Sequence, residues 1–425
     1  MQTRFSAAFL ETPAGQEADA ILRKCVHCGF CTATCPTYQL LGDELDGPRG
    51  RIYLIKEMLE GTEPSQATQL HLDRCLTCRA CETTCPSGVA YGRLLDIGRH
   101  HIERVVPRTF RERLFRRALL AVVPYRKRFS ALLALGRAFR VLMPTSLRQA
   151  VPSARPSGPW PTPRHQRRML VLTGCAQPAT APGINAAAAR VLDRLGISLL
   201  AAADGCCGAL AHHLSEEEQA REQMRRNIDA WWPQIELGVE ALVVTASGCG
   251  AMIRDYGTLL RDDPEYAPKA VRISELMRDI SQIVTQELAK SGVEQEWIAP
   301  GKVRSRVAFH SPCTLQHGLK VRGVIERLLE RAGYTLTSVA DGHLCCGSAG
   351  SYSLLQPAIS RQLKTNKLAA LQADGPDVIA TANIGCLLHL ASGTDRPVRH
   401  WIELLAEGLP DAGLWQTPRG PASAR

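Results

Sequence analysis

Aromatic residues, long apolar runs and glycine-rich nucleotide fingerprints are scarce or absent in this sequence. Aromatic side chains make up 5% of the chain and no nucleic-acid motif is recognisable, so we do not expect nucleic-acid binding. No apolar run approaches the roughly 18 residues of a membrane-spanning helix. The N-terminus, Met1 to Asp19, lacks the apolar segment of a signal peptide, which favours the cytoplasm. Without a G-x-G-x-x-G pattern, hydride chemistry on a bound nucleotide is not expected either.

Cysteine, in contrast, is abundant: the chain has sixteen, and eight of them form two copies of one spacing. Both copies read C-x2-C-x2-C-x3-C-P, the bacterial ferredoxin run that holds [4Fe–4S] clusters. In two-cluster ferredoxins the fourth cysteine of each run ligates the other cluster. We therefore predict two [4Fe–4S] clusters with crossed ligands, Cys25, Cys28, Cys31 and Cys85 for the first and Cys75, Cys78, Cys81 and Cys35 for the second.

Two other uses of these cysteines fit the sequence less well. Structural zinc is commonly held by two C-x2-C pairs, which would leave the third cysteine of each run without a role. Disulfide frameworks are typical of small secreted chains, whereas this chain is long and has no export signal. Cluster ligation in a reducing compartment is the better prediction.

The formal charge of +10 is concentrated between Arg99 and Arg148. This segment has thirteen basic residues and only two acidic ones, and apolar residues are interleaved among them. The pattern predicts two basic amphipathic helices separated at Pro124. Such helices suit an anionic membrane surface or an acidic partner subunit, and ordinary helices with solvated arginines are the alternative.

The remaining eight cysteines reveal an internal repeat. In each half, a strand-like run leads to a lone cysteine, a second short strand precedes Cys-Cys-Gly, and a third strand leads to a fourth cysteine. Equivalent positions in the two halves are 137 to 139 residues apart. The two sets are Cys175, Cys206, Cys207 and Cys249, and Cys313, Cys345, Cys346 and Cys386. Cysteines at the C-terminal ends of parallel strands lie where open α/β sheets bind ligands, so a further iron–sulfur centre is possible here, with a reactive dithiol or a structural role as alternatives.

These motifs predict an α + α/β protein with an N-terminal α-helical ferredoxin domain and two pseudo-repeated α/β domains. Helix-like patterns at Ile52–Leu59 and Ala67–Leu72, between the two ferredoxin runs, favour the α-helical type. A proline-rich stretch marks the boundary to the repeats. The predicted segments are 1–98 (ferredoxin domain), 99–150 (basic helices), 151–168 (linker), 169–290 and 303–410 (the two repeats) and 411–425 (flexible tail).

The chain as a whole resembles the iron–sulfur subunit of bacterial glycolate oxidase, with two cysteine-rich CCG domains. The resemblance extends from about Ile21 to Leu405, in the stretches CVHCGFCTATCPTYQLLGDELDGPRGRIYLIKEMLEG, HLDRCLTCRACETTCPSGV, NIDAWWP, TASGCG, HLCCGSAGSY and TANIGCLLHLASG. The CCG domains are also similar to those of heterodisulfide reductases, lactate-utilisation proteins and anaerobic glycerol-3-phosphate dehydrogenase. Met252 and His389 stand where heterodisulfide reductases have a further cysteine, so His389 is either a nitrogen ligand or a packed residue.

The resemblance implies a membrane-associated complex that oxidises glycolate to glyoxylate. An FAD-binding partner of the vanillyl-alcohol-oxidase type would take the hydride, and this chain would pass electrons from that flavin to an acceptor such as quinone. It also implies a cytoplasmic protein, peripheral on the inner face of the cell inner membrane, with no catalytic residue of its own. The alternatives are the same role in a D-lactate or glycerol-3-phosphate dehydrogenase complex, or a thiol/disulfide enzyme like heterodisulfide reductase.

Overall fold

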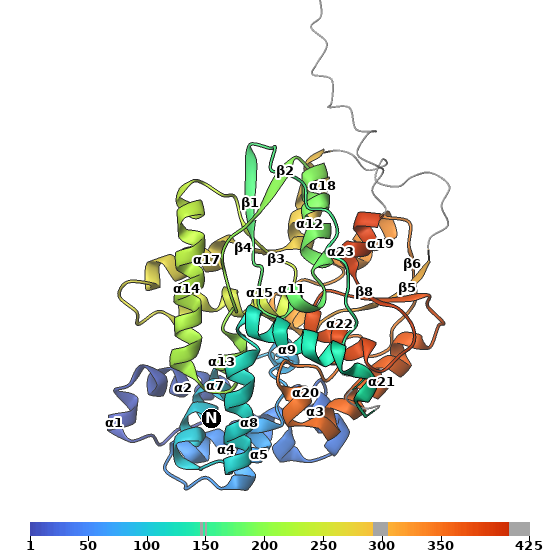
Figure 1. Cartoon of the computed structure of the whole chain (residues 1–425). Coiled ribbons are helices and arrows are strands. Elements are labelled where there is room, and N and C mark those ends of the chain that lie inside the picture. Colours follow the sequence, from blue (N-terminus) through green and yellow to red (C-terminus); the bar gives the residue numbers. More distant parts are fainter. Residues whose placement is uncertain (145–147, 149–150, 292–304, 408–425) are drawn as a thin grey trace, which may run out of the picture.

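A helical N-terminal domain lies against two α/β repeats that sit side by side (Figure 1). The computed structural model describes residues 1–144, 148, 151–291 and 305–407. We call residues 167–291 repeat 1 and residues 305–407 repeat 2. The predicted α + α/β fold class is confirmed. The predicted flexible tail, 411–425, lies outside the described residues.

The N-terminal domain consists of short helices joined by the two cysteine-rich loops. Its elements are α1 (Ala7–Leu10), α2 (Pro13–Lys24), η1 (Phe30–Thr32), α3 (Pro36–Leu41), η2 (Glu44–Asp46), α4 (Pro48–Leu59), α5 (Gln66–Asp73), α6 (Ala80–Thr84) and α7 (Tyr91–Val105). Proline opens α2, α3 and α4, because its fixed φ suits the first helical position. Helices α4 and α5 contain the two predicted helical patterns. Leu22, Ile55, Leu72 and Leu94 are fully buried between these helices and form the core of the domain.

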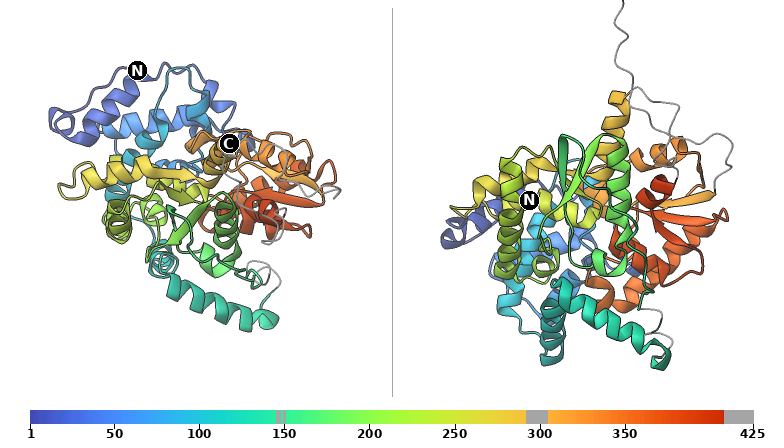
Figure 2. Two further views of the ribbon diagram at one scale, coloured as in Figure 1. Left: turned by 90° about the horizontal axis from the view of Figure 1, so that it is seen from above. Right: turned by 45° about the horizontal axis from the view of Figure 1, so that its top comes forward.

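Two basic helices, α8 (Phe110–Val122) and α9 (Arg126–Ala138), follow, with the short η3 (Arg140–Leu142) after them. They are separated at Pro124, as the sequence predicts. Only Leu120 of α8 and Leu133 of α9 are buried. Figure 2 shows α9 along the outer edge of the molecule. Within the described residues, no helix combines the length and the apolar character that crossing a membrane requires.

Each repeat alternates strands and helices around a four-stranded parallel sheet. Repeat 1 contains β1 (Arg167–Val171), α11 (Gln177–Thr180), α12 (Gly183–Arg194), β2 (Ile197–Ala201), α13 (Ala209–His213), α14 (Glu217–Glu236), β3 (Leu242–Val244), α15 (Ser247–Arg254), α16 (Tyr256–Leu259), α17 (Ala267–Leu276), β4 (Met277–Asp279) and α18 (Ile280–Ser291). Repeat 2 contains β5 (Arg306–His310), η4 (Thr314–Gly318), α19 (Val324–Arg331), β6 (Thr335–Leu336), α20 (Tyr352–Leu355), α21 (Pro357–Gln372), β7 (Val378–Thr381), α22 (Ile384–Ala391), β8 (Val398–His400) and α23 (Trp401–Glu407).

The two sheets have the same topology, which explains the internal repeat of the sequence. The strand orders are β2-β1-β3-β4 and β6-β5-β7-β8, with all neighbours parallel. The central strands β3 and β7 are buried along their whole length, as expected for strands covered by helices on both faces. The sequence did not predict the edge strands β4 and β8, because each has only three residues and leads directly into a helix. Strand β6, the short strand predicted before the second Cys-Cys-Gly, has only two residues.

The repeats pack on each other through one shared hydrophobic core. Helix α12 packs against α23, and α18 packs against α19. Buried polar groups cross the same boundary: the imidazole Nε2 of His400 lies 2.8 Å from the carbonyl oxygen of Thr245, and the hydroxyls of Ser247 and Thr314 are 2.8 Å apart. The C-terminal ends of the central strands, which carry cysteines, are therefore held in a fixed relation to one another.

Candidate metal centres

The first candidate site, site 1, is a cavity beneath the first cysteine run. It is lined by Cys25, Cys28, Cys31 and Cys85, the set that crossed pairing predicts. Most of the remaining lining is apolar: Val26, Pro48, Ile52 and Val89. Burial raises the pKa of the Cys31 thiol to about 11, so metal binding here must displace a proton. Four thiols around a small, largely apolar cavity fit an iron–sulfur cluster.

Two left-handed residues at equivalent positions shape each ferredoxin loop. His27 and Gly29 have φ of 57° and 85° in the first loop, and Thr77 and Arg79 have φ of 53° and 58° in the second. This turn directs main-chain N–H groups toward the sulfur atoms; the amide of Thr77 donates to the Sγ of Cys75 at 3.4 Å. Three of these four are not glycine, so the strained backbone must be held by the surrounding structure, as is common at functional sites.

The second site, site 2, is formed by Cys75, Cys78, Cys81 and Cys35. Burial raises the pKa of Cys78 well above its usual value, and the neighbouring thiols Cys313, Cys75 and Cys35 raise it further. Burial acts in the same way on Cys81, together with Cys78, Cys75 and Cys35. The structure thus brings together the second set of four cysteines. That either set ligates a cluster stays a prediction.

A buried charge network supports site 2 from the side of Cys35. The hydroxyl of Thr37 lies 3.3 Å from the Sγ of Cys35 and donates to the carbonyl oxygen of Asp46 at 2.7 Å. Arg51 donates to Thr37 at 3.2 Å and is 1% exposed. Although burial opposes its charge, nearby Cys75, Tyr91 and Cys35 raise the pKa of Arg51. The guanidinium is therefore a permanent positive charge beside thiols that must become thiolates. No sequence pattern indicated that Arg51 lies at this site.

In repeat 1, the sulfurs of Cys175, Cys206, Cys207 and Cys249 form a chain of neighbours, which we call site 3. Gly208, directly after the vicinal pair, has φ of 90°, as a tight turn at this point requires. Asn227 donates to the carbonyl oxygen of Cys206 at 2.8 Å, and the hydroxyl of Tyr256 donates to that of Cys207 at 2.9 Å. These contacts hold the loop against α14 and α16.

In repeat 2, site 4 comprises Cys313, Cys345, Cys346 and Cys386. The Sγ atoms of Cys313 and Cys345 are 3.9 Å apart. Cys386 lies in the first turn of α22, where the positive end of the helix dipole favours a thiolate, and the side chain of Asn383 donates to its Sγ at 3.4 Å. The sequence predicted Cys386 at the end of a strand or in the loop after it, whereas the structure places it in the first turn of α22, which follows β7.

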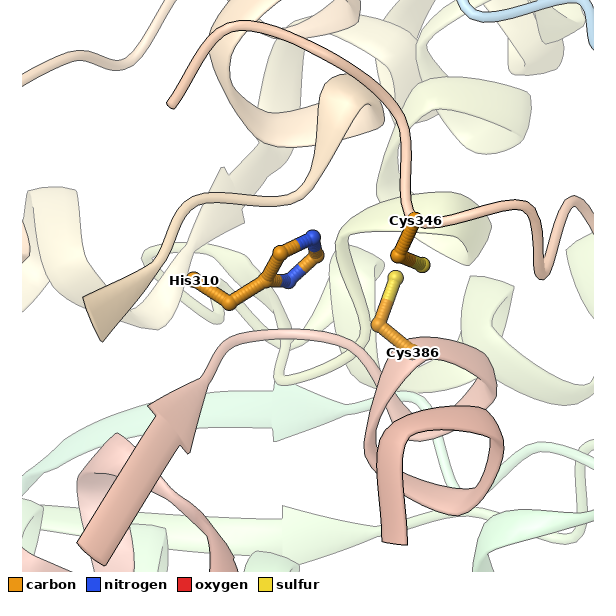
Figure 3. A group of neighbouring side chains, drawn as sticks. All are labelled: His310, Cys346 and Cys386. Atoms are coloured by element: carbon orange, nitrogen blue, oxygen red, sulfur yellow. The ribbon is translucent and has the colours of Figure 1, made fainter. Parts of the chain in front are cut away.

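Site 4 also contains side chains that the spacing of cysteines could not reveal. His310, at the end of β5, places a ring nitrogen within 4.8 Å of the sulfurs of both Cys346 and Cys386 (Figure 3). Lys367 of α21 is 4% exposed and lies near Cys345 and Cys346. Burial lowers the pKa of Lys367, and the two cysteines act in the opposite direction. His389, the candidate noted from the sequence, lies 3.4 Å from the hydroxyl of Ser360.

Sites 2 and 4 are neighbours. Cys78 interacts electrostatically with Cys313 and with Cys345. Leu76, Tyr352 and Leu363 pack with Cys313 and Cys345 in a small apolar cluster between the N-terminal domain and repeat 2. The hydroxyl of Tyr352 donates to the carbonyl oxygen of Arg74 at 3.1 Å across this boundary. Cys81 also lines the cavity of site 1, so sites 1, 2 and 4 follow one another through the protein.

Comparison with known protein families agrees with these sites. Residues 21–89 match the 4Fe-4S dicluster domain, and residues 169–254 and 307–391 each match the cysteine-rich domain of the CCG family. Sites 1 and 2 lie in the first region, and sites 3 and 4 lie in the second and third. The protein is thus an iron–sulfur protein.

Two relatives match this chain along most of its length and most of their own. The chain is 53% identical over 412 residues to the glycolate oxidase iron-sulfur subunit of Escherichia coli, which covers 96% of this chain and 99% of the relative. It is 31% identical to the probable glycolate oxidase iron-sulfur subunit of Bacillus subtilis, over 88% of this chain and 89% of the relative. Lactate utilization protein A of Geobacillus kaustophilus is 26% identical over 52% of this chain. The resemblance inferred from the sequence is confirmed.

Proposed function

This chain belongs to the family of glycolate oxidase iron–sulfur subunits, and we propose that it is the electron-transfer subunit of a complex that oxidises glycolate to glyoxylate. An FAD-binding partner subunit takes the hydride, and this chain passes the electrons singly to an acceptor such as quinone. The observation that carries this proposal is the succession of thiol sites from an exposed cysteine, Cys28, through site 2 to site 4.

Two [4Fe–4S] clusters are proposed for the N-terminal domain. Site 1 would use Cys25, Cys28, Cys31 and Cys85, and site 2 would use Cys75, Cys78, Cys81 and Cys35. When bound, such clusters supply one-electron transfer. The protein contributes the buried thiols, the N–H groups of the left-handed loops and the fixed charge of Arg51. The four cysteines of site 3 and the four of site 4 are proposed to hold further iron–sulfur centres.

The partner subunit is proposed to dock over site 1. Cys28 is the one exposed cysteine of the sixteen, all of which lie in the described residues. The side chains beside it, Val26 and Phe30, are 69% and 60% exposed, although both are apolar. Exposed apolar side chains at the most accessible thiol site suit contact with a second subunit.

The basic helices are proposed to hold the complex on the inner face of the cell inner membrane. Phe110 and Leu114 of α8 are 71% and 58% exposed, and Leu132 and Leu135 of α9 are each 55% exposed. These side chains lie among exposed arginines, such as Arg113 and Arg117. Exposed apolar groups together with a high positive charge suit an anionic lipid surface.

Cys78→Ser in the reconstituted complex tests the role in electron transfer. Cys78 lies between sites 2 and 4, so we expect glycolate still to reduce the partner's flavin while reduction of a dye or quinone is lost. Cys249→Ser, in site 3, is the matched control, because Cys249 is also a half-buried cysteine. If flavin reduction fails equally in an assembled Cys78→Ser complex, the chain takes part in hydride transfer and the proposal is wrong. Replacing glycolate by D-lactate or glycerol 3-phosphate in the same assay tests the alternative substrates.

A further inference from the structure

Two histidines near the cysteines, His27 and His310, have a buried Nε2 without a hydrogen-bond partner, and of these two only His310 is buried as a whole residue. Its Nδ1 lies 3.0 Å from the hydroxyl of Thr381, whereas its Nε2 is buried and makes no hydrogen bond. The residue is 2% exposed, so bulk solvent does not reach this atom. A buried imidazole nitrogen with no partner is costly, and in native proteins such atoms call for an explanation.

Two cysteine sulfurs near the ring of His310 suggest a role for this unpaired nitrogen. One nitrogen of His310 and the sulfurs of Cys346 and Cys386 all lie within 4.8 Å of one another, and all three residues are buried. In Figure 3 the ring points from the end of β5 toward both sulfurs, one on the loop after β6 and one on α22. When a histidine nitrogen and a cysteine sulfur bind the same metal ion, their bonds to it are about 2.0 and 2.3 Å long. The two ligand atoms are therefore normally less than 4.8 Å apart.

We propose that the Nε2 of His310 is a nitrogen ligand of the iron–sulfur centre in repeat 2, beside Cys346 and Cys386. This inference rests on the proposed function, which places an iron–sulfur centre at site 4. Thr381 is the supporting partner: when Nδ1–H donates to its hydroxyl, the lone pair of Nε2 is left to face the metal. Histidine ligands are commonly oriented in this way by a hydrogen bond to the other ring nitrogen.

The corresponding position of repeat 1 supports a specific role for this histidine. Leu172 stands three residues before Cys175, as His310 stands three residues before Cys313. Leu172 is buried in the apolar core and offers no ligand. The repeats have the same topology, so a purely structural requirement at this position is met by leucine. The two centres therefore differ: site 3 is an all-cysteine site, and site 4 is a mixed cysteine–histidine site.

The charges around site 4 agree with a neutral ligand. Lys367 is buried next to Cys345 and Cys346 and donates to the carbonyl oxygen of Asp341 at 2.7 Å. A histidine ligand adds no negative charge to a site that already gathers four thiols in the interior. Lys367 and a neutral histidine ligand both reduce the net negative charge of site 4. Replacement of cysteine by histidine ligands raises the reduction potential of iron–sulfur centres.

The test uses the full-length chain, purified without oxygen and labelled with ¹⁵N-histidine. Pulsed electron paramagnetic resonance on the reduced protein should show a nitrogen directly coupled to one iron–sulfur signal, and the coupling should change with the isotope. His310→Leu, which copies the repeat 1 residue, should abolish the coupling while sites 1 and 2 keep their signals. His389→Leu is the matched control, because this second histidine also lies near Cys346, and it should leave the coupling unchanged.

Two further variants keep the test decisive if His310→Leu does not fold. His310→Cys restores a metal ligand, so it should retain iron at site 4, lose the nitrogen coupling and shift the centre to a lower potential. Thr381→Val removes only the supporting hydroxyl and should weaken metal retention about 10–100-fold. A site 4 signal without nitrogen coupling, or a coupling that survives in His310→Cys, overturns the inference. A protein with iron at sites 1 and 2 alone overturns instead the proposed centre at site 4.

Discussion

The guanidinium of Arg51 lies 3.3 Å from the carboxylate of Asp46, and the two side chains are 1% and 0% exposed. Arg74 donates to the same carboxylate at 2.7 Å, and the Nδ1 of His71 lies 3.1 Å from it. Asp46 and the nearby Asp43 could in principle bind a cation with His71, but two arginines already satisfy the Asp46 carboxylate. The group is therefore a support for site 2 rather than a separate metal site.

Removing Arg51 should destabilise the N-terminal domain. Arg51→Met leaves part of the Asp46 charge uncompensated in the interior, so we expect a loss of about 3 kcal/mol in the free energy of unfolding and a lower iron content. Arg49→Met is the control, since Arg49 and its partner Glu44 are 37% and 40% exposed, and it should cost less than about 1 kcal/mol. Urea unfolding and iron analysis give both quantities; equal effects of the two variants would contradict this prediction.

Reversing charges on α8 and α9 should release the protein from anionic vesicles. Each basic residue near a lipid surface contributes about 1 kcal/mol, so changing Arg113, Arg117, Arg126 and Lys127 to Glu should weaken binding by at least about 100-fold. The control changes four exposed arginines of the repeats to Glu, Arg272, Arg278, Arg327 and Arg331. This control variant has the same net charge as the helix variant. In a sedimentation assay it should bind anionic vesicles nearly as strongly as the unchanged protein. Undiminished binding of the helix variant would exclude this surface as the lipid contact.

The contact between the N-terminal domain and repeat 1 should depend on pH. The Nε2 of His212 lies 3.3 Å from the carboxylate of Asp96. Burial opposes both charges, but the pairing outweighs it, raising the pKa of His212 above its usual 6.5 and lowering the pKa of Asp96 to about 2. The stabilisation from His212 is complete below pH 6.5 and is lost as the pH rises through its raised pKa. That from Asp96 is complete above its usual 3.8 and is lost as the pH falls toward 2.

We therefore expect the ion pair to stabilise the protein most between about pH 4 and pH 6.5. His212→Gln should remove the loss of stability that His212 causes as the pH rises above 6.5, which urea unfolding at several pH values would measure. His100→Gln is the control, because His100 pairs with Glu217 at a more exposed position. An unchanged pH profile in His212→Gln would contradict the assignment.

Gly347, after the vicinal cysteines of repeat 2, should not accept a side chain. Its φ is 87°, and a Cβ would lie 2.6 Å from the carbonyl oxygen of Ser360. Gly347→Ala should therefore displace the Cys345-Cys346 loop and reduce iron binding at site 4. Gly375→Ala tests the backbone strain alone, since Gly375 has φ of 58° but open space around it, and should cost about 1–2 kcal/mol without loss of iron. Equal iron contents in the two variants would disprove the role of the close approach.

The eight ferredoxin-type cysteines could be grouped from the sequence because ligand spacing within one loop is local information. The vicinal pairs repeat at a constant offset, which also indicated the two α/β domains. His310 could not be found in this way, since its position beside Cys346 and Cys386 depends on β5 pairing with β7. Arg51 and Lys367 are charged residues in helices, and a sequence pattern gives no reason to expect them in the interior. Only packing of distant segments brings them to the sulfurs.

The exposure of Cys28 also affects how sensitive the protein is to oxidants. The thiol site proposed to meet the partner is also the one that dioxygen and peroxide reach first, because Cys28 is exposed, whereas Cys81 is buried and Cys78 lies beside Cys313 of repeat 2. Oxidative damage should therefore begin at this corner and spread inward. A docked partner would act as a shield, so the subunit should lose its colour faster when it is made alone than when it is made together with its complex.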